Sequence, residues 1–227
     1  MRIALRLLSA CLLASGISQA WANGPGGMSA PAPMPREETP QQKARDAYND
    51  GVRSVKKADK AQAAAAQAGD ADKKDKAAQE ARERYAQALA RFQEATGLDP
   101  TLHEAWNYVG YTSRKLGHYD AALDAYDKAL TLKPGYADAL EYRGEAYLAL
   151  NRIPDAQQAY LDLFAGNRAL AGKLLTAMKT WVAEQRTNAP GGDASKLDEL
   201  DKWIQERAQI AGQTAALTRA GTAASWR

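Results

Sequence analysis

The 227-residue sequence is poor in the side chains that carry most enzyme chemistry. It has one cysteine and two histidines. The cysteine, Cys11, lies close to the N-terminus, so a chain that loses this segment has no thiol for a disulfide, a nucleophile or a metal site. His103 and His118 fall at predicted turns, and neither is expected to lie near a carboxylate. Two such histidines do not form a zinc site. The sequence also lacks a Gly-x-Ser-x-Gly elbow, a phosphate-binding glycine loop and a dinucleotide fingerprint. We therefore expect no catalytic residue, no metal and no cofactor.

The sequence also lacks an excess of one charge and an apolar run of membrane-spanning length. Lysine and arginine number 30 against 27 aspartates and glutamates. Nucleic-acid-binding proteins usually carry a basic stripe, and no such stripe is visible, so we expect no nucleic-acid partner. No apolar stretch reaches the roughly 20 residues that a membrane span needs, so we expect no span.

The N-terminal segment from Met1 to Ala22 has the layout of a secretory signal peptide. Arg2 and Arg6 precede a mostly apolar stretch at residues 7–17, and a small-x-small ending finishes at Ala22. We therefore expect cleavage after Ala22 and an exported, periplasmic protein.

An alternative interpretation of the N-terminus is a lipid anchor at Cys11. The tetrad that ends at Cys11 resembles the bacterial lipobox, but Arg6 leaves little apolar sequence before it. The residues that follow, 23–40, are rich in Pro, Gly and Ser and cannot bury enough surface to offset their ordering entropy. We interpret 23–40 as a disordered leader that acts as a spacer, with a proline-rich docking segment as the alternative.

Helical periodicity begins at residue 41, and no strand-like alternation appears along the chain. Two long Ala-rich helices are expected at residues 41–67 and 72–96, separated by a break at Gly69. Asp70 or Asp72 can cap the second helix, since a side-chain carboxylate satisfies the first backbone N–H groups. The pattern predicts an all-α chain.

A 34-residue self-similarity follows, between residues 103–136 and residues 137–170. Small residues recur at the same places in both units, as do the aromatic residues beside them. The aligned pairs are Gly110 with Gly144, Ala122 with Ala156, Tyr126 with Tyr160, and Gly117 with Asn151. Such a period is typical of a solenoid built from helical units.

The repeat resembles the tetratricopeptide repeat (TPR) family, whose pattern is W-x2-L-G-x2-Y, then A-x3-F-x2-A, then P. The first unit matches it at Trp106, Val109, Gly110, Ala122, Tyr126, Ala129 and Pro134. The second unit departs from it at Leu140, Arg143, Leu163 and Arg168. The resemblance implies an α-α superhelix, a TPR-like solenoid of antiparallel helix pairs.

Within each predicted pair, the small residues have packing roles. Gly110 and Gly144 let the first helix of a unit approach the second, and Gly117 or Asn151 ends the first helix in the left-handed region. Asp120 can cap the second helix of the first unit.

The predicted domain layout follows from the repeat, with a helical domain at 41–212 between the leader and a tail. Within this domain we expect a degenerate repeat at 41–102, repeats at 103–136 and 137–170, and a diverged capping helix pair at 171–212. Residues 213–227 carry few bulky side chains and are predicted to form a flexible tail. Trp226 in that tail could be a docking anchor or a residue without a role.

By the resemblance, the first helix of each unit lines a concave face that binds a peptide or protein. The expected groove residues are Glu104, Asn107, Tyr111, Arg114, Lys115, Asp138, Glu141, Glu145 and Leu148. Some family members bind chaperone C-termini through a Lys/Asn/Arg clamp, but Tyr111 and Glu145 stand where that clamp needs Asn. The residues favour a ligand with basic or aromatic side chains, and an ordinary solvated face is the alternative.

We therefore predict a non-enzymatic scaffold or adaptor of the bacterial cell envelope that binds a protein or peptide partner. One alternative is an accessory subunit of an envelope enzyme or assembly complex. Another is a self-assembling structural protein, a homo-oligomer formed through the helices at 41–67 and 72–96.

Overall fold

The structure is a computed structural model that describes residues 38–188 and 194–224. The predicted signal peptide, Cys11, most of the predicted leader, and Trp226 lie outside the described residues.

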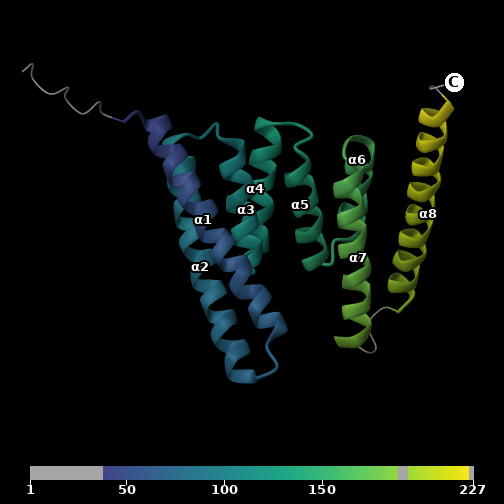
Figure 1. Ribbon diagram of the computed structural model, residues 1–227, viewed down its shortest axis with the longest axis horizontal. Coiled ribbons are helices and arrows are strands. Elements are labelled where there is room, and N and C mark those ends of the chain that lie inside the picture. Colours follow the sequence, from purple (N-terminus) through teal and green to yellow (C-terminus); the bar gives the residue numbers. More distant parts are fainter. Residues whose placement is uncertain (1–37, 189–193, 225–227) are drawn as a thin grey trace, which may run out of the picture. The chain divides into compact units, whose positions relative to one another are not determined.

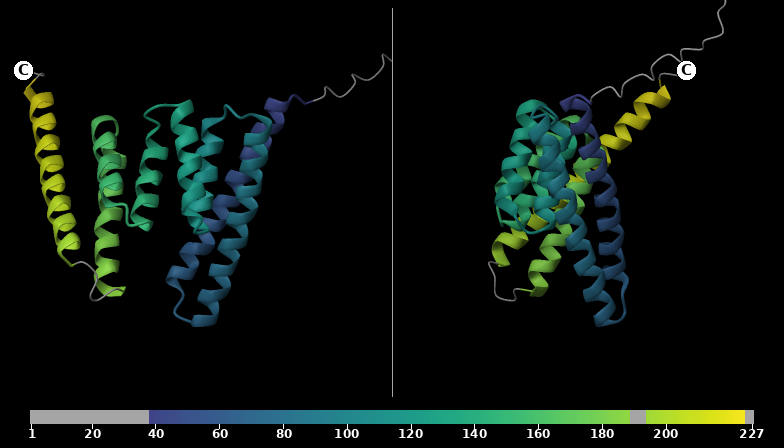
Figure 2. Two further views of the ribbon diagram at one scale, coloured as in Figure 1. Left: turned by 180° about the vertical axis from the view of Figure 1, so that it is seen from behind. Right: turned by 90° about the vertical axis from the view of Figure 1, so that its left-hand side faces the viewer.

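Eight helices and no strand make up the described residues, as the sequence predicts (Figure 1). Helices that follow one another in the chain lie side by side, and this order is also visible from behind (Figure 2). The helices are α1 (Pro40–Gln67), α2 (Ala71–Leu98), α3 (His103–Lys115), α4 (Tyr119–Leu132), α5 (Ala137–Ala149), α6 (Ile153–Gly166), α7 (Arg168–Asn188) and α8 (Ala194–Ala224).

The two Ala-rich helices pack against each other within the chain. Ala44 and Ala58 of α1 and Ala88 of α2 are fully buried. Alanine adds only a methyl group between the helix backbones, so these two helices can approach closely over their length. The predicted break lies between them, and Asp70 caps α2 by accepting a hydrogen bond from the Lys73 N–H at 3.0 Å.

Two further antiparallel pairs, α3 with α4 and α5 with α6, correspond to the two predicted repeats. Gly117 has φ +85° and Asn151 has φ +55°, which confirms the left-handed residue after the first helix of each pair. The predicted cap at Asp120 is wrong. Asp120 lies in the first turn of α4, whose N-cap position is His118 with no capping side-chain hydrogen bond.

Close approach at Gly110 confirms its predicted role, because a Cβ there would lie 2.5 Å from the Tyr126 ring of α4. The prediction that Gly144 packs against the second helix of its own repeat is wrong. A Cβ at Gly144 would lie 2.6 Å from Leu174, which belongs to α7 and not to the paired helix α6. Helix α7 therefore approaches α5 at the position where the first repeat brings in its own second helix.

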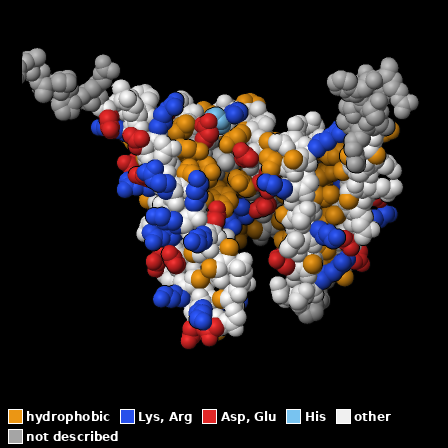
Figure 3. Space-filling model, viewed as in Figure 1, with side chains coloured by type: hydrophobic (Ala, Val, Ile, Leu, Met, Phe, Trp, Pro, Cys, Tyr) orange, Lys and Arg blue, Asp and Glu red, His pale blue; other side chains and the backbone are white. Residues whose placement is uncertain are grey.

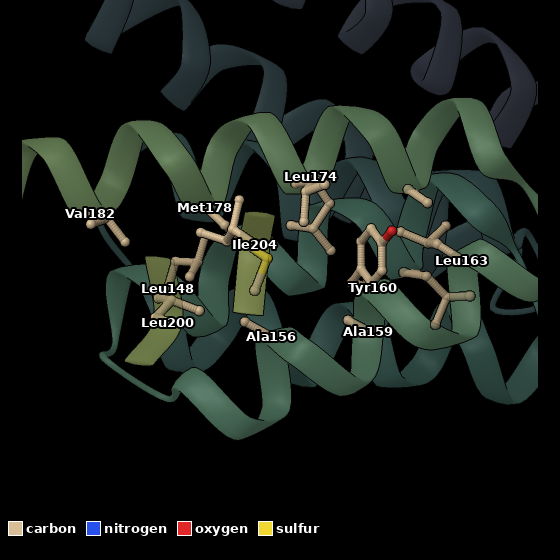
Figure 4. Close-up of a cluster of buried hydrophobic side chains, with 13 residues drawn as sticks. Leu148, Ala156, Ala159, Tyr160, Leu163, Leu174, Met178, Val182, Leu200 and Ile204 are labelled. Atoms are coloured by element: carbon tan, nitrogen blue, oxygen red, sulfur yellow. The ribbon is translucent and has the colours of Figure 1, made fainter. Parts of the chain in front are cut away.

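The C-terminal helices share one apolar core with the second repeat (Figure 4). Leu174 of α7 lies near Tyr160 of α6, Met178 and Val182 continue the α7 side of the same core, and α8 adds Leu200. The tail was expected to be flexible from residue 213, but α8 continues to Ala224. The Ala- and Thr-rich sequence therefore extends the helix by about three turns beyond the predicted end.

Candidate functional site

The first helices of the successive pairs contribute side chains to one shared surface, which we call the helix-A face. Contacts between α1, α3 and α5 define it: the Tyr111 hydroxyl donates to Asp59 Oδ1 at 2.8 Å, and the Tyr111 and Tyr142 rings lie 5.0 Å apart. Figure 3 shows apolar side chains with acidic and basic groups among them over these helices. The face consists of Tyr48, Asp59 and Gln62 of α1, Glu104, Asn107, Tyr108, Tyr111, Arg114 and Lys115 of α3, and Asp138, Glu141, Tyr142 and Glu145 of α5.

Most of the predicted groove residues are half-buried on this face, but three are buried. Leu148 is 3% exposed and belongs to the apolar core with α6 and α7, so its predicted place on the groove is wrong. Asn107 is 2% exposed and Glu141 is 5% exposed, although both are predicted to line an accessible groove. The spacing that places residues on one side of a helix does not reveal how deeply the neighbouring helices cover them.

The part of the face near the C-terminal end of α3 forms a closed polar network. Asp59 Oδ1 accepts hydrogen bonds from the Tyr111 hydroxyl and, at 2.6 Å, from the Tyr85 hydroxyl. The Lys115 ammonium donates to the Gln62 side chain at 2.7 Å. Burial lowers the pKa of Lys115, with the neighbouring Arg114 guanidinium as the next cause. The charges here already have partners, which leaves little for a ligand to satisfy.

Arg114 and Glu145 form an ion pair at 2.6 Å across α3 and α5, with both side chains less than a third exposed. The Arg114 guanidinium also lies 5.5 Å from the Tyr111 ring centre and 5.7 Å from that of Tyr142. Planar guanidinium groups stack on aromatic faces in this way. Tyr111 and Glu145 occupy the same position in the two repeats. Both side chains therefore already make contacts within the chain.

A row of aromatic rings runs along the middle of the face, and sequence reasoning singled out only part of it. The Phe92 ring stacks on Tyr108 at 4.8 Å, and Tyr48 lies 5.7 Å from Tyr108. Tyr108 and Tyr142 are one repeat period apart, which is a signal that the repeat alignment could have used. Burial raises the pKa of Tyr48 to about 12, with Tyr108 and Glu104 as further causes. The hydroxyl therefore stays protonated near neutral pH and can donate a hydrogen bond.

The part of the face near the N-terminal ends of α3 and α5 carries carboxylates with few partners. Glu104 Oε2 lies 3.0 Å from His103 Nδ1, so the expectation that His103 lacks a carboxylate neighbour is wrong. Asp138 and Glu141 form no ion pair within the part of the chain that the structure describes. Burial raises the pKa of Glu141 to about 7, and the Glu145 carboxylate is the second cause. Of the two ends of the helix-A face, this one offers negative charge to a ligand.

Beyond this face, a pocket of about 510 Å³ lies between α6 and α8, and no sequence pattern indicated it. Ile153, Pro154, Leu200 and Trp203 provide its apolar lining. The Trp203 ring meets the Tyr160 ring edge to face at 5.2 Å, which ties α8 to α6.

Two searches of the described residues gave negative results. None of the helices at 40–188 and 194–224 combines the length and apolar character that a membrane span requires. Among the same residues, no three His, Cys, Asp or Glu side chains are grouped so that they could hold a metal ion.

Residues 103–136 match the family described as Tetratricopeptide repeat. These bounds are the same as those of the first predicted repeat, which confirms the TPR assignment for α3 and α4. Together with the stacked antiparallel helix pairs, the match establishes a TPR-like helical solenoid.

Two relatives show sequence similarity over part of the chain. The Hsp70-Hsp90 organizing protein of Triticum aestivum is 30% identical over 135 residues, which cover 58% of this chain and 23% of that protein. The uncharacterized protein ycf37 of Guillardia theta is 33% identical over 88 residues, which cover 37% of this chain and 49% of that protein. The chain thus spans about a quarter to half the length of these relatives.

Two solved structures have a similar arrangement of helices. One is the first TPR of Spaghetti (RPAP3) bound to the HSP90 peptide SRMEEVD, with a TM-score of 0.46 and 16% identity, covering 63% of this chain and 95% of that chain. The other is the TPR2B-domain:pHsp70-complex of yeast Sti1, with a TM-score of 0.38 and 14% identity, covering 73% of this chain and 98% of that chain.

Proposed function

We propose that this protein is a non-enzymatic adaptor of the bacterial cell envelope that binds a peptide segment of a partner protein on the helix-A face. The observation that carries the proposal is the row of tyrosine rings beside Asp138 and Glu141, two carboxylates without an ion pair in the described chain. Tyrosine supplies a large contact area with few rotors to restrict, and it is enriched at binding hot spots.

Charge complementarity favours a partner segment with basic side chains. The positive groups Arg114 and Lys115 on this face already have partners, Glu145 and Gln62. Acidic groups without an ion pair remain at the N-terminal end of α5, next to aromatic surface. A basic ligand side chain would gain both Coulomb attraction and contact with the rings.

The proposed location rests on the N-terminal sequence alone. The signal-peptide prediction requires removal of the segment that ends at Ala22, and the intact mass of the protein recovered from a periplasmic fraction tests this directly. A mass that still includes Met1, or a diacylglyceryl group on Cys11, would contradict cleavage after Ala22.

The binding proposal is tested with two matched charge reversals, Asp138→Lys on the helix-A face and Asp124→Lys on the exposed side of α4. Bait protein carrying either change is incubated with periplasmic extract, and captured proteins are compared with those of the wild type. We expect Asp138→Lys to lose the partner and Asp124→Lys to keep it. Asp138→Lys should melt slightly lower than the wild type but remain folded, because it reverses a charge in the first turn of α5. Equal capture by both variants would place the partner elsewhere.

The alternative of self-assembly through α1 and α2 finds less support in the fold. The alanine-rich faces that could pair between chains are buried in the α1–α2 contact, as Ala44, Ala58 and Ala88 illustrate. Native mass spectrometry of the full chain distinguishes the two functions, because the adaptor needs no oligomer. If the protein is instead an accessory subunit of an envelope enzyme, the same capture experiment should recover that enzyme as the partner.

A further inference from the structure

Helix α8 extends beyond the core that it helps to form. Leu200 and Ile204 are buried in that core, but none of the α8 side chains from residue 205 to residue 217 is buried. The C-terminal end of α8 projects away from the other helices (Figure 2). Two large apolar side chains lie on the exposed stretch, Ile210 at 40% exposed and Leu217 at 73% exposed.

The exposed stretch of α8 is also uncharged. Residues 196–207 contain seven Asp, Glu, Lys or Arg residues, whereas residues 208–218 contain none. The solvent-facing side of a surface helix normally carries charged or polar residues. Ile210 and Leu217 depart from this pattern, and without charges nearby two copies of the stretch can meet with no repulsion.

The same side of α8 leads to the pocket between α6 and α8. Trp203, Ile210 and Leu217 are spaced by seven residues, which is close to two helical turns, so they follow one line along the helix. Trp203, at the start of this line, belongs to the pocket lining. A helix that lies along Ile210 and Leu217 therefore points toward the pocket.

The pocket suits an aromatic side chain that carries a hydrogen-bond donor. Its volume of about 510 Å³ is within the range of about 300–1,000 Å³ that is usual for ligand sites. Ile153, Pro154 and Leu200 provide apolar walls, and Asn151 and Gln157 bring amide oxygens that can accept a hydrogen bond. A tryptophan ring matches both features, because its apolar surface is large and its N–H needs an acceptor when buried.

Trp226 can enter this pocket only from a second copy of the chain. It lies outside the described residues, two positions after Ala224, the last residue of α8. The helix from Trp203 to Ala224 is about 32 Å long at 1.5 Å per residue. Two further residues reach about 7 Å at most. Trp226 therefore cannot fold back to the pocket of its own chain.

One antiparallel arrangement of two α8 helices accounts for both the exposed stretch and the pocket. When the centre of the pair lies half-way between Ile210 and Leu217, Ile210 of each copy is opposite Leu217 of the other. The same arrangement brings Trp226 of each copy within about one helical turn of the level of Trp203, beside the pocket. A two-fold interface requires such self-complementarity, since each residue must contact its counterpart in both directions.

We propose that the protein forms an antiparallel dimer through α8, in which Trp226 of each copy occupies the α6–α8 pocket of the other. The pocket is incomplete without the second copy. The helix-A face belongs to α1, α3 and α5, so this inference does not rest on the proposed function. A dimer presents two helix-A faces, and a partner with two binding segments would be held more tightly because the second binding step becomes intramolecular.

Cysteine cross-linking tests the arrangement, in a chain that also carries Cys11→Ser. Gln213→Cys lies next to the centre of the pair, so its two thiols should form a disulfide between the copies under mild oxidation. Glu206→Cys is the matched control, one heptad earlier on the same side of α8. Its two thiols are about 22 Å apart along the helix axis in the antiparallel pair and should not cross-link. Equal cross-linking of both variants would overturn the antiparallel arrangement.

Sedimentation equilibrium over a range of protein concentrations measures the dimer itself. Leu217→Lys should weaken dimerisation at least about tenfold because it places a charge in the uncharged contact, and Trp226→Ala should do the same because it empties the pocket. Leu132→Lys, at a 42% exposed position of α4, is the control and should dimerise like the wild type. Melting of each variant by circular dichroism confirms that the fold is retained.

The outcomes separate this inference from the proposed function and from other modes of assembly. A wild type that stays monomeric would overturn the inference and leave the proposed function standing. A dimer that only Trp226→Ala leaves unchanged would overturn the assignment of the pocket. A dimer that neither Leu217→Lys nor Trp226→Ala weakens would overturn the α8 interface and favour pairing through α1 and α2.

Discussion

Replacement of Glu141 by glutamine should stabilise the protein at alkaline pH. Glutamine has nearly the same shape as glutamate but cannot carry a charge, so it removes the unpaired buried carboxylate while keeping the packing. The expected gain comes from the pKa of Glu141, which burial and Glu145 raise from an ordinary value of 4.5 to about 7.

The direction of the pH effect follows from proton binding. Between about pH 4.5 and pH 7, the folded protein holds a proton on Glu141 that the unfolded chain has lost. The free energy of unfolding therefore falls as the pH rises through this window, and it changes no further above it. A rise in pKa from 4.5 to about 7 corresponds to at most about 3 kcal/mol, since one pKa unit is about 1.36 kcal/mol.

The assay is urea denaturation of the wild type, Glu141→Gln and the control Glu184→Gln at several pH values between 4 and 8.5. The stability difference between Glu141→Gln and the wild type should be small at pH 4 and should reach its largest value, in favour of the variant, by about pH 8. Contributions of titrating groups that do not interact with Glu141 are shared by both proteins and cancel in this difference. A variant that is less stable than the wild type at pH 8, or a difference that does not change with pH, would refute the reasoning.

Two other changes test the packing of the fold. Gly110→Ala should destabilise the protein by about 1–3 kcal/mol in thermal melts, because the new methyl group meets the rigid, buried Tyr126 ring, and Gly144→Ala should cost less because the methyl groups of Leu174 can rotate away. Equal losses would contradict this distinction. Tyr111→Ala should cost about 2–4 kcal/mol and Tyr111→Phe about 1 kcal/mol, since alanine removes ring contacts and the hydrogen bond while phenylalanine removes only the bond. An unchanged melt of Tyr111→Ala would mean that these contacts contribute nothing to stability.

Much of the fold could be predicted from the sequence because small residues at a fixed period leave few alternatives. Gly110 and Tyr126 occur where two helices must touch, and Gly117 occurs where a helix must end in the left-handed region. The prediction failed where several solutions have similar energies. An acidic residue near a helix start, such as Asp120, interacts favourably with the helix dipole without acting as a cap.

The candidate site could be predicted only as a set of positions. The repeat register identified which residues of α3 and α5 lie on the helix-A face, including Glu104, Asn107 and Glu141. It did not reveal that Arg114 and Glu145 pair with each other, because that contact depends on the rotation between two helices that belong to different repeats. Burial of Asn107 and Glu141 was missed for a related reason, since neighbouring helices decide it.

The burial of Glu141 and the unexpected partner of Gly144 occur on the same side of α5. The two residues are three positions apart in α5 and therefore lie on the same side of that helix. Leu174 of α7 packs so closely onto Gly144 that an added Cβ would lie 2.6 Å from its side chain. Lys173, the residue before Leu174, is the α7 group that acts on the charge of Glu141. Helix α7 thus packs against α5 but supplies no ion pair to Glu141 within the described chain. The glycine that was predicted to pack within one repeat therefore lets α7 approach the side of α5 that carries Glu141.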